Sequence, residues 1–88
     1  MKKLLKFSAS WCGSCKDYQP VWDRVVKDLH ADWDVQEISL DDESATDIAI
    51  QYGVKTLPTT IIVKDEHVKI LRGKQTRRQL LSAIGITK

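Results

Sequence analysis

Two cysteines are the residues of this sequence best suited to chemistry. Cys12 and Cys15 are its only cysteines, and two residues, Gly13 and Ser14, separate them. A C-x-x-C pair can bind a metal ion, close a structural disulfide or cycle between a dithiol and a disulfide. The residues around the pair indicate which of these three kinds of chemistry to expect.

A zinc site needs further ligands at a suitable spacing. His30 follows the cysteines in a C-x2-C-x14-H pattern, which is similar to half of a zinc-finger motif. The other histidine, His67, lies 37 positions further along the chain, whereas the last two finger ligands are usually about 3–5 residues apart. The sequence therefore disfavours zinc, and we expect no cofactor.

A structural disulfide is disfavoured as well, because the stabilisation from a disulfide grows with the loop it closes and this loop is very short. A reacting dithiol fits better. A helical pattern begins at or just after Cys12, and the unpaired N–H groups and dipole of a helix N-terminus favour a thiolate there. Lys16 adds a cation one turn on. We expect Cys12 to attack a substrate disulfide and Cys15 to resolve the resulting mixed disulfide.

Four strands and three helices are expected to position this pair. Apolar and β-branched patterns predict strands at 2–8, 33–40, 59–63 and 68–71, and helices from Cys15 to about His30, from Ser44 to Gly53 and from Thr76 to Gly85. Ser44 and Asp47 predict a capping box for the second helix, and Thr76 and Gln79 predict one for the third. The first two strands should be parallel with a right-handed crossover, and the last two should form a hairpin. The expected fold is α/β, a βαβαββα domain over residues 1–88 with a mixed four-stranded sheet and three helices.

Length and composition limit the classes of function. With 88 residues, 42% of them hydrophobic and 30% charged, the chain fits one ordinary globular domain. A net charge of +2 gives no indication of nucleic-acid binding. The basic start has only Leu4 and Leu5 before a lysine, short of the roughly 7–15 apolar residues of an export signal, and no stretch approaches the ~20 of a membrane helix. We expect a cytoplasmic protein without a membrane partner.

Three separated stretches resemble the thioredoxin family. "WCGSCK" is similar to that family's active-site stretch, although Ser14 stands where the family has proline. "YGVKTLPT" resembles the segment that carries the family's cis-proline, here Pro58, and "RGKQTRRQL" resembles the passage into the last helix, with Gly73 matched. The resemblance covers nearly the whole chain but starts at what would be the family's second strand. It implies a short thioredoxin-like fold, close to glutaredoxins in size.

The resemblance also implies an activity and roles for residues. The activity is thiol–disulfide exchange, mainly reduction of protein disulfides, with Cys12 attacking and Cys15 resolving. The Trp11 ring would lie on the surface beside the cysteines, and the backbone of Leu57 would pair with an extended substrate segment. The substrate-binding residues implied are Trp11, Gly13, Ser14, Leu57, Pro58 and Gly73. The implied partners are protein disulfides and a flavoprotein thioredoxin reductase, and the implied state is a monomer.

Two other functions stay open on the sequence alone. The short chain is compatible with a glutaredoxin-like, glutathione-dependent oxidoreductase, although Trp11 fits the thioredoxin pattern better. The fold could also serve as a binding adaptor in which the thiols are idle. Unchanged biological activity of a Cys12→Ser variant would favour the adaptor.

Basic residues gather in the segments that the resemblance places around the substrate. These residues are Lys55, Arg72, Lys74, Arg77 and Arg78. A basic rim would attract acidic partners at low salt. The alternative is a solvated basic face without effect on docking.

Lys6 and Glu37 present an exchanged pair of charges. The family usually has an aspartate six residues before the first cysteine and a lysine as its partner on the next strand, and these positions hold Lys6 and Glu37. Lys6 shares a strand face with Leu4, so we expect it to be buried and paired with a carboxylate. Glu37 could then accept the proton of Cys15, directly or through water. The alternative is that Lys6 extends to solvent and Glu37 is an exposed strand charge.

Overall fold

The sheet contains four strands in the spatial order β2-β1-β3-β4. The computed structural model describes residues 1–29 and 31–85. Its strands are β1 (Lys2–Ser8), β2 (Trp33–Ser39), β3 (Thr59–Lys64) and β4 (His67–Arg72). β1 pairs parallel with β2 and antiparallel with β3, and β3 pairs antiparallel with β4. The mixed sheet and the final hairpin are confirmed, and each strand ends within one residue of its predicted boundary.

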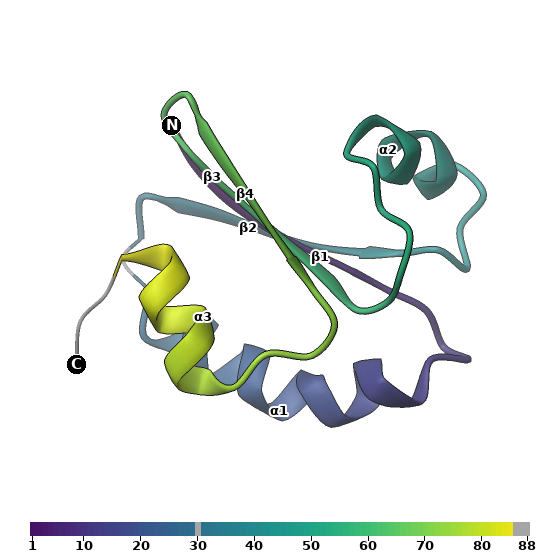
Figure 1. The fold of residues 1–88 in the computed structure, drawn as a ribbon, viewed down its shortest axis with the longest axis horizontal. Coiled ribbons are helices and arrows are strands. Elements are labelled where there is room, and N and C mark those ends of the chain that lie inside the picture. The colour runs from purple at the N-terminus through teal and green to yellow at the C-terminus, as the bar shows by residue number, and fades with distance from the viewer. Residues whose placement is uncertain (30, 86–88) are drawn as a thin grey trace.

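Three helices cover the two faces of the sheet. They are α1 (Gly13–Lys27), α2 (Ala45–Gln51) and α3 (Arg77–Ile84). Helices α1 and α3 lie on one face and α2 lies on the other (Figure 1). No helix within residues 1–29 and 31–85 has the length and apolar character needed to cross a membrane.

Helix α1 starts earlier than the predicted Cys15. Cys12 has an extended backbone, with φ −93° and ψ 109°, and its side chain caps the helix, so the first helical residue is Gly13. The helix ends at Lys27, and the predicted end near His30 falls outside the described residues. The early start places both cysteines in the first turn, where the N-terminal N–H groups are unpaired.

The two predicted capping boxes have different outcomes. At α3 the Thr76 side chain accepts from the Gln79 backbone and the Gln79 side chain accepts from Thr76, which confirms that box. At α2 the prediction for Ser44 was wrong, because Ser44 already has helical backbone angles and makes no cap hydrogen bond. A capping oxygen reaches the backbone N–H three residues on when its own residue has extended backbone angles, and the helical angles at Ser44 do not meet this condition. The Ser44 hydroxyl donates to Oδ1 of Asp42, at 2.8 Å.

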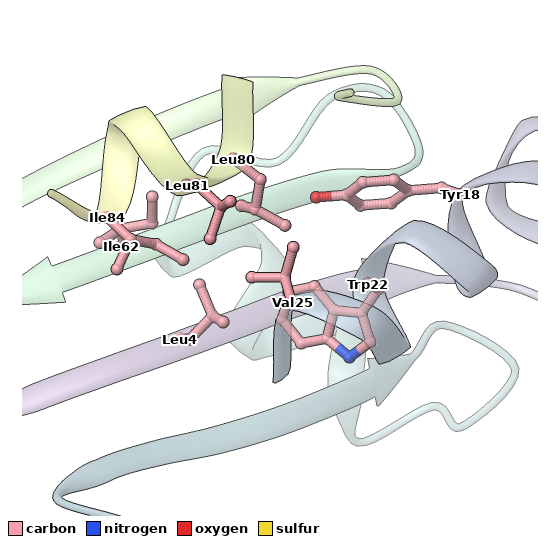
Figure 2. Packing of buried hydrophobic residues seen from close by; sticks show 8 residues of the cluster. All are labelled: Leu4, Tyr18, Trp22, Val25, Ile62, Leu80, Leu81 and Ile84. Atoms are coloured by element: carbon pink, nitrogen blue, oxygen red, sulfur yellow. The ribbon is translucent and has the colours of Figure 1, made fainter. Parts of the chain in front are cut away.

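The core lies on both sides of β1. Leu4 faces α1 and α3, whereas Leu5 and Phe7 face α2. Figure 2 shows the larger cluster, which consists of Leu4, Tyr18, Trp22, Val25, Ile62, Leu80, Leu81 and Ile84. Because β1 is buried on both faces, it fixes the start of the loop that follows it, and that loop leads to the cysteines.

Candidate active site

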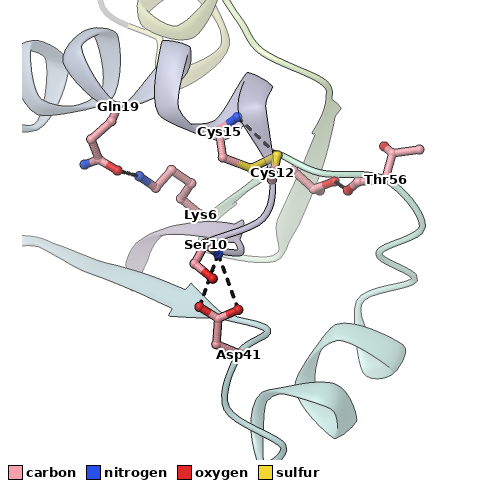
Figure 3. Close-up of a disulfide and its surroundings, with 8 residues drawn as sticks. Lys6, Ser10, Cys12, Cys15, Gln19, Asp41 and Thr56 are labelled. Carbon is pink, nitrogen blue, oxygen red and sulfur yellow. Dashed lines mark hydrogen bonds between the residues drawn. A yellow bond between two sulfur atoms is a disulfide. The ribbon is translucent and has the colours of Figure 1, made fainter.

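Cys12 and Cys15 form a disulfide where the loop after β1 enters α1 (Figure 3). Their Cα atoms are 5.3 Å apart, and both side chains are almost fully buried. The backbone N–H of Cys15 donates to Sγ of Cys12 at 3.1 Å. In the reduced protein the same N–H would stabilise negative charge on Cys12. Gly13 and Ser14 lie between the cysteines and are exposed.

Asp41 holds the loop that leads to the cysteines. Both of its carboxylate oxygens accept from the Ser10 backbone N–H, at 3.3 and 3.1 Å (Figure 3). Within the loop, the Cys12 N–H donates to the Ala9 carbonyl at 3.1 Å. These bonds connect the segment after β2 to the loop between β1 and α1.

A groove of about 330 Å³ lies beside Cys12. Trp11 and Leu57 border it together with Cys12, and Trp11 is 73% exposed. The other lining residues are Leu40, Val54, Lys55 and Thr56. Most of this lining is apolar, which suits contact with an extended segment of a partner protein.

Pro58 and Gly73 are not among the residues that line the groove. The Leu57–Pro58 peptide bond is cis, as the resemblance implied, and Pro58 is buried. The Gly73 N–H donates to the Pro58 carbonyl at 2.8 Å. Gly73 has a φ of 83°, a conformation that other residues rarely adopt. The hydrogen bond from Gly73 to Pro58 therefore fixes the backbone next to Leu57, which lines the groove.

Lys6 and Glu37 pair as expected, one on each of two adjacent strands. Lys6 is fully buried, and its Nζ lies 2.8 Å from Oε1 of Glu37. The Lys6 side chain runs toward Gln19, away from the disulfide, and donates to the Gln19 amide oxygen (Figure 3). Its Nζ also lies 5.3 Å from the centre of the Trp22 ring. Glu37 is 51% exposed, so the pair connects the core with the surface, and its role in proton transfer stays a prediction.

A Glu37→Gln variant is expected to change how stability depends on pH. The hydrogen bond from Lys6 lowers the pKa of Glu37 below its ordinary 4.5, ahead of an opposing effect of burial. A lowered carboxyl pKa contributes stability above pH 4.5 that is lost as the pH falls through the folded-state value. The parent should therefore be more stable than the variant at pH 7, by under about 1 kcal/mol because Glu37 is half exposed, and the difference should shrink toward pH 3.

Urea unfolding of both proteins at pH 7, 5 and 3 measures this difference. Glu66→Gln, in the turn between β3 and β4, is the matched control for the loss of a carboxylate. A stability difference between the parent and Glu37→Gln that is the same at all three pH values would contradict the expectation.

The zinc hypothesis named the two histidines as ligands besides the cysteines. His67 is exposed at the start of β4, and His30 lies outside the described residues. Among residues 1–29 and 31–85, no group of three or more His, Cys, Asp or Glu side chains could hold a metal ion.

Five residues of the site were not predicted as such. Leu40, Val54 and Thr56 line the groove, Asp41 anchors the loop, and Gln19 contacts both members of the Lys6–Glu37 pair. Gln19 follows Cys15 by four residues, a spacing that puts two helix residues on the same side. That spacing was the one sequence signal that could have indicated Gln19.

The sequence is similar to known proteins along almost its whole length. The profile of the family described as Thioredoxin matches residues 1–85. The chain belongs to the thioredoxin family. Together with the Cys12–Cys15 disulfide, this makes it a thiol–disulfide oxidoreductase that acts on protein disulfides.

Individual members of the thioredoxin family match nearly the whole of this chain, which covers about three quarters of their length. A thioredoxin of Staphylococcus epidermidis is 34% identical over 83 residues, which cover 93% of this chain and 78% of that protein. A thioredoxin of Pseudomonas aeruginosa is 33% identical over 78 residues, 88% of this chain and 70% of that protein. The oxidised crystal structure of mitochondrial thioredoxin 3 from Saccharomyces cerevisiae has a TM-score of 0.80 and 27% identity, covering 94% of this chain and 76% of that one.

Proposed function

We propose that this oxidoreductase works mainly as a reductase of protein disulfides. The Cys12 thiolate attacks one sulfur of the substrate, so a Cys12–substrate bond forms while the substrate disulfide breaks and its other sulfur leaves as a thiol. Cys15 then loses its proton and attacks the Cys12 sulfur. The second substrate thiol leaves, the Cys12–Cys15 disulfide forms, and two electrons have passed to the substrate.

The groove beside Cys12 is the observation that carries this proposal. Cys12, the exposed Trp11 ring and Leu57 all line it. Leu57 is followed by Pro58, which has no backbone N–H. An extended substrate strand can pair with the Leu57 backbone while its cysteine meets Cys12. Gly13 and Ser14 would border the same strand, and Pro58 and Gly73 would keep the Leu57 segment in position.

The electron source is proposed to be a flavoprotein thioredoxin reductase. NADPH oxidation coupled to insulin reduction tests this, with thioredoxin reductase in one assay and with glutathione and glutathione reductase in the other. We expect turnover with thioredoxin reductase. Turnover with glutathione alone would contradict the proposal and indicate a glutaredoxin-like enzyme.

We further propose that residues 1–88 act as one domain and that the protein is a monomer in the cytoplasm. Light scattering of the purified protein tests whether it is a monomer.

The Lys6–Glu37 pair is proposed to take part in the second step of the cycle, in which Cys15 attacks the Cys12 sulfur of the mixed disulfide. Cys15 must lose its proton before it attacks, and the Glu37 carboxylate can accept that proton through water. Lys6 keeps the carboxylate in place through the 2.8 Å contact. The pair would thus serve the same step as the family's aspartate, with the two charges on exchanged strands.

A Lys55→Glu variant is expected to lose a preference for acidic substrates. Lys55 is the only charged residue among the described residues that line the groove, and a cation there attracts disulfides flanked by Asp or Glu. With a disulfide peptide that carries aspartates beside its cysteine, the rate of attack should fall about tenfold at low salt and about twofold at 0.5 M salt.

Lys27→Glu, in the last turn of α1, is the matched control for the change in net charge. It should leave the rate with the aspartate peptide close to that of the parent. A peptide with lysines in place of the aspartates should react faster with Lys55→Glu than with the parent. Equal rates for the two peptides with the parent, at low and high salt, would show that the basic rim does not select substrates.

A further inference from the structure

Four polar side chains meet beside the middle of α1, apart from the substrate groove. We call Lys6, Gln19, Asp23 and Glu37 the Gln19 cluster. The Gln19 oxygen accepts from Lys6, and its nitrogen donates to Oδ1 of Asp23 at 2.8 Å and to Oε1 of Glu37 at 3.0 Å. Gln19 therefore connects a residue of β1 and a residue of β2 to the helix that carries the cysteines.

These contacts permit only one orientation of the Gln19 amide. Its oxygen must face the Lys6 ammonium, and its NH2 group must face the two carboxylates, because a reversed amide would point N–H bonds at the cation. An apolar side chain at this position would leave the fully buried Lys6 with Glu37 as its one remaining partner in the cluster. A glutamate would set a like charge against Asp23 and Glu37.

Gln19 also borders the space beside Cys15. The two residues are one helical turn apart on the same side of α1, and both line a pocket of about 430 Å³. Its other lining residues are Ser8, Ala9, Ser10, Lys16, Ser39 and Asp41. Lys6, Asp23 and Glu37 are not among them, so Gln19 is the member of the cluster that reaches both the ion pair and the pocket. A pocket of this size with polar walls has room for water.

We propose that Gln19 is a positioning residue for the second step, because it holds the Lys6–Glu37 pair behind the water-accessible pocket through which the Cys15 proton leaves. This inference rests on the proposed reductase cycle. As the Cys15 S–H bond breaks, the proton passes to water and then to the Glu37 carboxylate. The Cys15 sulfur forms its bond to Cys12, and the substrate thiolate leaves. Glu37, half exposed, then releases the proton to solvent.

Other charges also face this path. Lys16 of α1 and Asp41 after β2 line the pocket, Asp23 of α1 contacts Gln19, and Lys6 of β1 contacts Glu37. The Lys6 hydrogen bond lowers the pKa of Glu37, so the carboxylate is ionised at neutral pH, holds an accepted proton only transiently and passes it on to solvent. These groups together determine how the second step depends on pH.

Rapid mixing of the reduced protein with a disulfide peptide separates attack from the second step, which is followed from pH 5 to pH 9. In Gln19→Leu we expect the second step to slow about tenfold at pH 7, with attack by Cys12 within about twofold of the parent. Gln51→Leu, at the exposed end of α2, is the matched control and should behave as the parent does. Gln19→Glu keeps an acceptor for Lys6, so it carries the test if Gln19→Leu does not fold. Its added charge should move the acid limb of the second step to higher pH.

The outcomes separate this inference from the function on which it rests. The role of Gln19 would be overturned if the second step of both Gln19 variants depended on pH as it does in the parent. It would also be overturned if attack and the second step slowed equally, because equal slowing indicates a purely structural effect. If Glu37→Gln slows the second step and the Gln19 variants do not, the role of Gln19 is overturned while the proton path stands. If the parent forms no mixed disulfide at Cys12, the reductase cycle fails, and the inference fails with it.

Discussion

A Cys12→Ser variant is expected to reduce insulin disulfides no faster than the reductant does without protein. The thiolate is the nucleophile in disulfide exchange, and a serine hydroxyl at this position stays protonated and does not attack sulfur. Cys12 is also the residue that joins the helix N-terminus to the groove, since its Sγ accepts the Cys15 N–H and its side chain lines the groove. The chain's one other cysteine, Cys15, does not line the groove.

Cys15→Ser is the informative companion to that variant. It keeps the attacking thiol but removes the one that releases the substrate, so each molecule should react once and then hold the substrate on Cys12. Turnover of insulin should stop in both variants, but a stable covalent adduct should form in Cys15→Ser alone. Catalytic turnover by Cys12→Ser would contradict the assignment of Cys12 as the attacking thiol.

A Trp22→Ala variant is expected to lose a large part of the protein's stability. Trp22 is 1% exposed in the core between α1 and the sheet, with its ring centre 6.3 Å from that of Tyr18. Truncation of a buried tryptophan costs about 3–5 kcal/mol, and a domain of this size has a free energy of unfolding of about 5–15 kcal/mol. The ring also lies against the buried Lys6 ammonium, so that contact is lost as well.

Trp11→Ala is the matched control for this loss. The same residue type is removed, but from a position 73% exposed to solvent, so the stability change should stay within about 0.5 kcal/mol. Urea unfolding of the oxidised proteins, followed by far-UV circular dichroism, measures both changes. A loss below about 1 kcal/mol in Trp22→Ala would contradict the packing described for this core.

Most of the fold could be predicted because its signals are local. The alternation along β1 correctly assigned Leu4 to one face and Leu5 and Phe7 to the other, since side chains of a strand alternate between its faces. The capping pattern at Thr76 was correct, whereas the same pattern at Ser44 failed. A capping box depends on extended backbone angles at its first residue, and Ser44 has helical angles.

The site was predictable where its residues are close in sequence or in strand register. The cysteines follow from their spacing. The Lys6–Glu37 pair was implied by the resemblance to the thioredoxin family, and in the structure the parallel register of β1 and β2 places the two residues opposite each other. Gln19 was missed because its contacts depend on how α1 lies across the end of β2, which no local pattern specifies. Leu40 and Val54 meet beside Cys12 for the same reason, since they come from different loops that only the folded chain brings together.

The most direct test of the reacting dithiol is alkylation of the reduced protein across pH, with the two cysteines followed separately by peptide mass mapping. The helix N-terminus and the Cys15 N–H both favour a thiolate on Cys12. We therefore expect Cys12 to react much faster than Cys15, with a midpoint below the ~8.5 of a free thiol. Equal rates at the two cysteines, or a Cys12 midpoint at or above that of a free thiol, would contradict the account.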